Sequence, residues 1–344
     1  MFQPKFIVTN QLLANIKRIS EVVTSLNERR FPQVVLLDLE KEAREISSFA
    51  STSIEGNPLP LTDVKRLLKS APAQMRDTER EVINYNTALT ELKKNHAAEQ
   101  AILNEGLILK IHHWVMDQLL PSGLCGKFRK DAVFVNDPRS RTTVFWPADH
   151  QDVSKLMNEL LVFIKHEQGT IDPLILAGLF HKQFIMIHPF MDGNGRTVRL
   201  ATKVLLAALG LDTFNLFSFE RYYNANVTKY FAMVGERGNY YDLQINFTPW
   251  LEYFTGGILD ELLRVQKELE QAVISPGSGL KAHHRIILDY LKEHGSITDA
   301  IYATLTSRAK PTRALDFRYL LDQGLIDRHG IGRSTYYRSK SDHV

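Results

Sequence analysis

The segment from Ile187 to Leu200, IHPFMDGNGRTVRL, gathers polar residues and glycines where the surrounding sequence follows an amphipathic helical pattern. His188 has the one side chain here whose ordinary pKa suits proton transfer near neutral pH. Asp192 offers a hard oxygen of the kind that Mg²⁺ prefers. Arg196 and Arg199 are three residues apart, so on a helix they share a face and could both reach a polyphosphate. These residue types at this spacing predict phosphate chemistry.

The backbone of this segment supports the same prediction. Gly193 and Gly195 let a ligand approach the main chain closely and permit positive φ angles. A loop that runs into a helix offers free backbone N–H groups and the positive end of the helix dipole. Each feature alone has an ordinary explanation: a structural histidine, a turn, or a solvated pair of arginines. Their conjunction within twelve residues favours nucleotide transfer to a hydroxyl.

Most of the remaining sequence predicts helices that would position this loop. Apolar residues at three- and four-residue spacing predict two helices separated by Pro32 and a long helix over about residues 76–99. One helix beginning near Pro173 and one ending at Gly210 flank the loop. β-branched and aromatic runs on both sides of residues 136–140 predict a hairpin. We therefore expect a mostly α fold with one hairpin before the C-terminal region.

Composition narrows the class of protein. The chain has 344 residues, 44% hydrophobic and 24% charged, with a formal net charge of +3, as in ordinary globular proteins. The start lacks the basic-then-apolar order of a signal peptide, and no apolar run is long enough to cross a bilayer. A single cysteine, Cys125, allows no internal disulfide, which fits a reducing compartment. We expect a cytoplasmic protein with no membrane association.

The sequence HPFMDGNGR followed by Arg199 resembles the signature of Fic proteins, His-Pro-Phe-x-Asp/Glu-Gly-Asn-Gly-Arg-x-x-Arg, and matches it at every position. The resemblance implies an all-helical core with the loop between two central helices. It implies transfer of AMP from ATP to a Ser, Thr or Tyr hydroxyl of a protein, with Mg²⁺, and self-modification as a side activity. Doc-type members replace Gly-Asn-Gly by a bulkier sequence and phosphorylate, so these glycines favour AMP transfer.

The same resemblance implies a role for each residue of the loop. His188 would be the general base, and Asp192 would be the Mg²⁺ ligand. Asn194 and the loop amides would hold the α-phosphate side, and the two arginines would hold the β- and γ-phosphates. A tyrosine of the region 217–231 would contact adenine. The nucleotide-binding residues implied are Gly193, Asn194, Gly195, Arg196, Arg199 and Tyr230.

A second motif precedes this loop by more than a hundred residues. In STSIEGN, Glu55 ends a helix, where an acidic residue opposes the helix dipole and invites a partner. The stretch resembles the inhibitory motif Ser/Thr-x-x-x-Glu-Gly/Asn of class II Fic proteins, with Ser51, Glu55 and Gly56 at the matching positions. The implied mechanism is a salt bridge from Glu55 to Arg199 that occupies the γ-phosphate site. Some members use the corresponding glutamate to reverse the modification, which the sequence leaves open here.

The predicted hairpin over Ala132–Pro147 resembles the flap of Fic proteins, which binds the segment to be modified as an added strand. A plain surface hairpin is the alternative. The lead-in CGKFR resembles the Gly-x-x-Arg of the family. The predicted target-docking residues are Val133, Phe134, Val135, Val144 and Phe145.

The C-terminal region has a separate pattern. Residues 271–280 are rich in Pro, Gly and Ser and predict a linker. Residues 281–344 predict three short helices and a hairpin, the order of a winged helix-turn-helix, with eleven Lys and Arg against seven Asp and Glu. Binding to DNA and binding to protein both stay open. The predicted organisation is an N-terminal helical region over 1–104 with an inhibitory helix over about 34–56, a Fic core over 105–270, the linker, and the winged helix.

The leading hypothesis is thus an autoinhibited protein adenylyltransferase. One alternative is a DNA-binding regulator whose Fic core senses nucleotide. Another is a de-AMPylase that uses Glu55. The identity of the target and the formation of a homodimer are not decided by the sequence.

Overall fold

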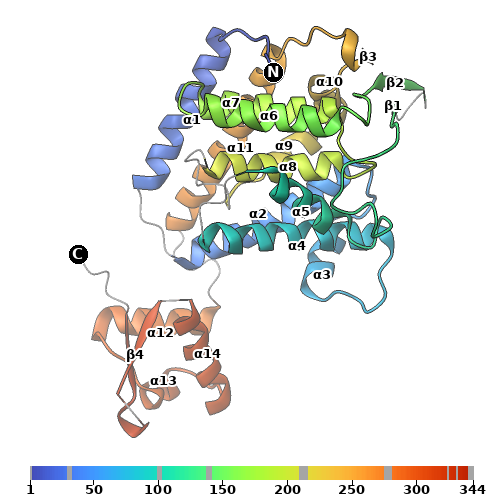
Figure 1. Ribbon diagram of the computed structural model, residues 1–344. Helices are drawn as coiled ribbons and strands as arrows, with labels where there is room; N and C mark the ends of the chain where they lie inside the picture. Colours follow the sequence, from blue (N-terminus) through green and yellow to red (C-terminus); the bar gives the residue numbers. More distant parts are fainter. Residues whose placement is uncertain are drawn as a thin grey trace. The chain divides into compact units, whose positions relative to one another are not determined.

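The computed structural model of the chain describes residues 2–28, 33–98, 103–136, 142–208, 216–274, 281–323, 325–330 and 332–339. These residues are mostly helical, as the sequence predicts (Figure 1). They divide into two compact units, one of Met1–Asn27 with Glu42–Arg264 and the other of Glu28–Lys41 with Val265–Val344. None of the described helices has the length and apolar content needed to cross a membrane.

The first unit contains the helices that surround the loop. Its elements are α1 (Asn10–Glu28), α2 (Gln33–Ile54), α3 (Leu61–Lys69), α4 (Asp77–Ala98), α5 (Glu105–Met116), β1 (Val135–Asn136), β2 (Thr143–Trp146), α6 (Val153–Glu167), α7 (Pro173–Ile187), α8 (Asn194–Ala208), α9 (Phe219–Ala225), α10 (Val227–Val234), β3 (Gly238–Asn239) and α11 (Thr248–Ile274). The last residue of α1, the start of α2 up to Lys41 and the end of α11 from Val265 are counted with the second unit. Helix α7 packs against α6 and α8, and α8 also packs against α4 and α5. The loop therefore joins two helices at the centre of this unit (Figure 1).

Helix α7 shows why these residues form a buried helix. Its sequence, PLILAGLFHKQFIMI, is apolar on nearly every face, and thirteen of its residues are buried. Pro173 occupies the first turn, and the Asp172 carboxylate accepts a hydrogen bond from the Leu174 amide at 2.9 Å. Trp250 of α11 packs inside the unit and donates to the carbonyl of Gly178 at 2.8 Å. The packing of the core thus fixes the position of α7, the helix whose C-terminal end leads into the loop.

The predicted hairpin is present and has a third strand beside it. Strands β1 and β2 pair antiparallel, with Val135 opposite Phe145, and β3 adds parallel to β2. The third strand was missed because Gly238 and Asn239 carry no strand pattern. Residues 137–141 of the predicted hairpin lie outside the described residues.

The second unit contains α12 (Ala282–His294), α13 (Asp299–Leu305), α14 (Lys310–Asp322) and an antiparallel hairpin of β4 (Ile326–His329) and β5 (Tyr336–Ser339). Three helices followed by a hairpin is the element order that the sequence predicts, and the name winged helix stays a prediction. Helix α11 continues through Ile274, so the first four residues of the predicted linker are helical; residues 275–280 lie outside the described residues.

Candidate active site

The loop begins with a residue in an unusual backbone conformation. His188 caps α7 with φ 53° and ψ 62°, in the left-handed region that non-glycine residues rarely adopt. Its amide donates to the carbonyl of Phe184 at 3.0 Å and thereby closes the last helical turn. Because an L residue in this region is disfavoured by roughly 1–2 kcal/mol, the surrounding contacts must hold it there. Such strain at a polar residue is typical of functional sites.

The hydrogen bonds of His188 define its protonation. Its Nδ1 lies 3.2 Å from the carbonyl of Ile185, which can only accept, so the proton is on Nδ1 and the basic lone pair is on Nε2. Burial lowers the pKa of His188 below its ordinary value, which keeps the ring neutral at pH 7. A neutral imidazole with a defined basic nitrogen is suited to accept a proton.

Arg129 holds the loop against the hairpin. Its guanidinium donates to the carbonyl of His188 at 2.8 Å, to that of Asp131 at 3.0 Å and to that of Ala148. Its own amide donates to the carbonyl of Pro189 at 3.0 Å. The side chain is only 3% exposed, and burial lowers its pKa, so these charge-assisted hydrogen bonds are made away from water. Arg129 is the arginine of the CGKFR lead-in noted in the sequence.

His112 of α5 also contacts the loop, and its local sequence did not reveal this role. Its ring stacks on Phe190 with centroids 3.7 Å apart. Its Nε2 donates to the carbonyl of Asp192 at 3.1 Å, and its Nδ1 accepts from the amide of Gly126 at 2.9 Å. Burial lowers the pKa of His112 to about 4, so the neutral ring keeps both contacts.

Asn194 and Gly193 complete the fold of the loop. The side chain of Asn194 accepts from the amide of Phe190 and donates to its carbonyl, both at 2.9 Å. Gly193 has φ +74°, and a Cβ there would lie 2.5 Å from Sδ of Met116. The structure thus places Asn194 on the loop backbone, and its predicted contact with the α-phosphate stays a prediction.

Both predicted arginines are buried on one face of α8. Arg196 is 3% exposed, and its guanidinium lies 3.4 Å from Asp192 and 3.3 Å from Glu81. Among the described residues no acceptor is bonded to Nε of Arg196 or to Nη1 of Arg199. Buried guanidinium groups with unfilled donors favour an anionic ligand. The carboxylate of Asp192 is 59% exposed beside them.

Ser51 and Glu55 both contact Arg199, and an inhibitory role for these contacts stays a prediction. Nη2 of Arg199 donates to Glu55 at 2.8 Å and to the carbonyl of Ser51 at 2.9 Å, and its Nε donates to the Ser51 hydroxyl at 2.8 Å. Although burial alone would lower it, the pKa of Arg199 is raised by the Glu55 carboxylate. A Cβ at Gly195 would lie 2.2 Å from Glu55, so glycine makes room for this carboxylate. Gly56 follows with φ +96° just beyond the end of α2.

The predicted docking residues divide between the two faces of the hairpin. Phe134 is 56% exposed, whereas Phe145 is 1% exposed and belongs to the core. Val133, Val135 and Val144 are half-buried. Strand β1 is at the edge of the described three-stranded sheet. The hairpin thus has a strand edge and an apolar residue that a peptide could meet.

Tyr230 lies in an aromatic cluster of the core. It is 1% exposed, stacks on Tyr223 at 4.6 Å, and its hydroxyl lies 3.2 Å from Nε2 of His181. The other ring nitrogen of His181 contacts Thr202 at 2.9 Å, so both nitrogens have partners inside the core. Contact of Tyr230 with adenine therefore stays a prediction.

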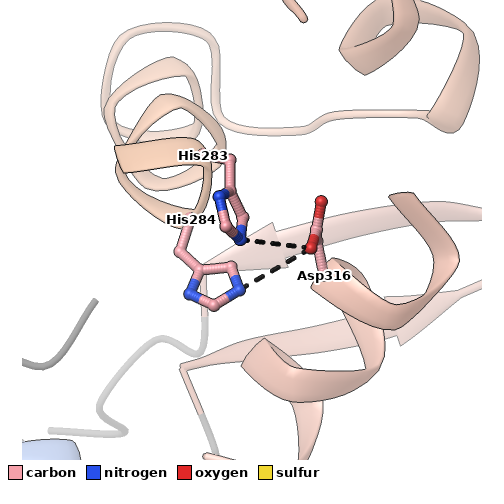
Figure 2. Close-up of side chains that lie close together, drawn as sticks. All are labelled: His283, His284 and Asp316. Atoms are coloured by element: carbon pink, nitrogen blue, oxygen red, sulfur yellow. Dashed lines mark ion pairs between the residues drawn. The ribbon is translucent and has the colours of Figure 1, made fainter. Parts of the chain in front are cut away.

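A second cluster of chemistry-bearing residues lies in the second unit. Figure 2 shows His283 and His284 pointing toward Asp316, at 3.4 Å and 3.8 Å. The same carboxylate accepts two hydrogen bonds from Arg308, at 2.7 Å and 3.0 Å, and one from Tyr302 at 3.0 Å. Because Arg308 already neutralises Asp316 and would repel a cation, we interpret this cluster as a polar contact among helices.

Comparisons with known proteins find a family match that includes the loop. The Fic/DOC family matches residues 102–206. The protein adenylyltransferases Fic of Aedes aegypti and Drosophila melanogaster are each 28% identical over an alignment of 221 residues that covers 58% of this chain and 42% or 43% of theirs. The chain thus spans less than half the length of these curated relatives.

Two solved structures share the fold. A Fic family protein from Desulfovibrio desulfuricans G20 has a TM-score of 0.65 at 21% identity and covers 100% of both chains. Fic-1 (residues 134–508) from C. elegans has a TM-score of 0.59 at 20% identity, covering 76% of this chain and 73% of its own.

Proposed function

Because the chain carries a Fic domain in a mostly helical Fic-like fold, we propose that it transfers AMP from ATP to protein hydroxyls and that Glu55 restrains this activity. The observation that carries the proposal is the pair of buried arginines with unfilled donors, next to a neutral His188 whose basic nitrogen is defined. This combination supplies a polyphosphate site beside a proton acceptor. Relatives of the Fic domain that are named protein adenylyltransferases support the same reaction.

The residues of the loop can accept the proton and stabilise the leaving group of this reaction. The oxygen of a Ser, Thr or Tyr hydroxyl attacks the α-phosphorus of ATP, and the bond from that phosphorus to the bridging oxygen breaks. The hydroxyl proton passes to Nε2 of His188, and pyrophosphate leaves with the bonding electrons. Arg196 and Arg199 would stabilise the charge that develops on the pyrophosphate.

Asp192 fits the role of a Mg²⁺ ligand. Its carboxylate is exposed at the start of α8, its backbone is fixed by His112, and it supplies the hard oxygen that Mg²⁺ prefers. The bound ion would help to neutralise the phosphates.

Glu55 accounts for the proposed restraint. Its carboxylate occupies an N–H of Arg199 that the γ-phosphate would otherwise use, at 2.8 Å. Charge-assisted hydrogen bonds contribute about 1.5–3 kcal/mol, so removing the carboxylate should raise productive ATP binding roughly tenfold or more. Glu55 is 28% exposed at its side chain and follows the last residue of α2, so water reaches its carboxylate.

The testing experiment uses ATP with a radioactive α-phosphate. Wild type, Glu55→Gly and Glu55→Gly/His188→Ala are incubated with it, and label on protein is measured together with ATP binding. We expect strong label on Glu55→Gly and at least about a hundredfold less on the double variant, with ATP still bound. Equal label on these two variants would refute the base assignment. No label on any variant, with ATP bound, would favour a nucleotide-sensing regulator or a de-AMPylase.

The DNA-binding alternative loses support from the second unit. Two of its basic residues are held by carboxylates: Arg308 pairs with Asp316, and Arg313 donates to both oxygens of Asp299 at 2.8 Å and 2.9 Å. Arginines used in this way contribute less to phosphate binding. We therefore prefer the enzymatic proposal.

A further inference from the structure

A second set of polar contacts joins α2 to α8 beyond the inhibitory pair. Ser47 and Ser51 are four residues apart on one face of α2, and Glu55 follows four residues later, in the turn that ends the helix. On α8, Lys203 contacts Ser47 at 3.3 Å, while Arg199 contacts both Ser51 and Glu55. The two helices thus meet along a row of polar pairs, of which the inhibitory salt bridge is the last.

Lys203, the α8 residue that contacts Ser47, also forms a buried ion pair with Glu220. Lys203 is 2% exposed at its side chain and Glu220 of α9 is fully buried, with 3.1 Å between their charged atoms. Lys203 also donates to the carbonyl of Phe217 at 3.2 Å. Taking two charges out of water is unfavourable unless their remaining hydrogen bonds are satisfied.

Glu220 satisfies its oxygens with donors from three separate segments. Tyr85 of α4 donates to one oxygen at 2.9 Å. Ser47 of α2, at 3.2 Å, and Ser218, at 3.0 Å, donate to the other. All three donors are at most 1% exposed. These hydrogen bonds connect α2, α4 and α9 to one buried carboxylate.

We propose that Lys203 and Glu220 are positioning residues that fasten α2 to the Fic domain through Ser47 and thereby set how often Glu55 leaves Arg199. The proposal rests on the proposed function, in which Glu55 restrains AMP transfer. Its physical basis is the rigidity of a helix, since a shift of α2 at Ser47 also displaces Ser51 on the same face and Glu55 in the turn attached to the helix end. The catalytic residues themselves do not contact this pair.

Ser47→Ala tests the proposal without removing a buried charge. It deletes the one α2 hydroxyl that reaches the pair and leaves Lys203 and Glu220 bonded to each other. Ser218→Ala is the matched control, because it removes a hydroxyl from the same carboxylate oxygen without altering α2. Both variants are measured in full-length protein with Glu55 present and again with Glu55→Gly.

With Glu55 present, Ser47→Ala should raise labelling from α-labelled ATP about two- to tenfold, the change that losing one hydrogen bond produces. Ser218→Ala should leave labelling unchanged. In the Glu55→Gly background neither substitution should add label, because no inhibitory contact is left to weaken. Equal labelling by the two serine variants, or an equal gain in the Glu55→Gly background, would overturn the proposal.

Hydrogen exchange of the α2 amides separates this proposal from the proposed function. If Glu55→Gly takes up no label, the adenylyltransferase proposal fails, and exchange decides the anchoring alone. Faster exchange over residues 45–54 in Ser47→Ala than in Ser218→Ala would support the anchor. The same exchange in both variants would refute it.

Discussion

At the scale of single residues, His112 shows how a buried side chain acts on the loop without touching a substrate. One ring nitrogen holds the carbonyl of Asp192, the other accepts from Gly126, and the ring face covers Phe190. The carboxylate proposed to hold Mg²⁺ therefore depends on a residue of another helix. Such support keeps a site within the small tolerance that catalysis needs.

His112→Phe should keep the stacking on Phe190 and lose both hydrogen bonds. In the Glu55→Gly background we expect a fall of about ten- to a hundredfold in kcat, because a displacement of about 1 Å costs up to a hundredfold in rate. ATP binding to the two arginines should change little. Steady-state labelling at varied ATP concentration measures both quantities.

The neighbouring histidine supplies the control for this prediction. His113 is exposed, so His113→Phe should keep the parent kcat. His112→Asn can donate to the carbonyl of Asp192 and should recover part of the activity. An unchanged kcat in His112→Phe would show that the loop holds its shape without the imidazole.

Residue roles could be predicted where the signal is local in sequence. The residues from His188 to Arg199 are contiguous in the sequence, so their types and spacing together indicate phosphate chemistry. His112 meets Asp192 across 80 residues and Ser47 meets Glu220 across 173, and neither pair has a local pattern. Only the fold brings such partners together, so sequence spacing could not reveal them.

At the scale of elements, the loop and the hairpin are parts of one assembly. Arg129 donates to the carbonyl of His188 in the loop and to that of Ala148 just after β2. Arg129 thereby fixes the hairpin relative to His188, the proposed base. A peptide bound at the β1 edge would be held in a defined position relative to that base. The helices followed from apolar periodicity and the hairpin from its β-branched and aromatic runs, whereas β3 has neither pattern in its two residues.

The exposed ring of Phe134 offers a test of the hairpin as a docking element. Phe134→Ser should reduce labelling of a protein target about fivefold or more, since an exposed aromatic that becomes buried contributes about 1–3 kcal/mol. Because the ring is exposed, the thermal midpoint should stay within about 2 °C of the parent. Target labelling in the Glu55→Gly background is compared with ATP binding. Loss of ATP binding together with target labelling would contradict a docking role.

At the scale of the whole molecule, three buried histidines make the folded chain sensitive to acid. Burial lowers the pKa of His112 and of His284 to about 4, and that of His181 well below its ordinary value of 6.5. Between pH 6.5 and about 4 the unfolded chain binds more protons than the folded chain at these residues. The contribution of these histidines to the free energy of unfolding is therefore complete above pH 6.5 and decreases as the pH falls toward 4.

The two units can be followed separately because the three tryptophans, Trp114, Trp146 and Trp250, all belong to the first unit. Tryptophan fluorescence should report the contributions of His112 and His181, whereas circular dichroism reports the helices of both units. In acid, His284 would add a positive charge near His283, Arg308 and Lys281, whereas Asp316 would favour that charge.

His284→Phe should make the second unit less sensitive to acid. Phenylalanine can keep the stacking on Tyr319, and Nδ1 of His284 has no hydrogen-bond partner among the described residues. The substitution should therefore change the free energy of unfolding at neutral pH only slightly. Urea unfolding at pH 7.5 and pH 5 is measured with both probes on the full chain. We expect the loss of stability between the two pH values to shrink in circular dichroism and to stay the same in tryptophan fluorescence. An equal loss for wild type and variant in circular dichroism would show that His284 is protonated without strain in the folded unit.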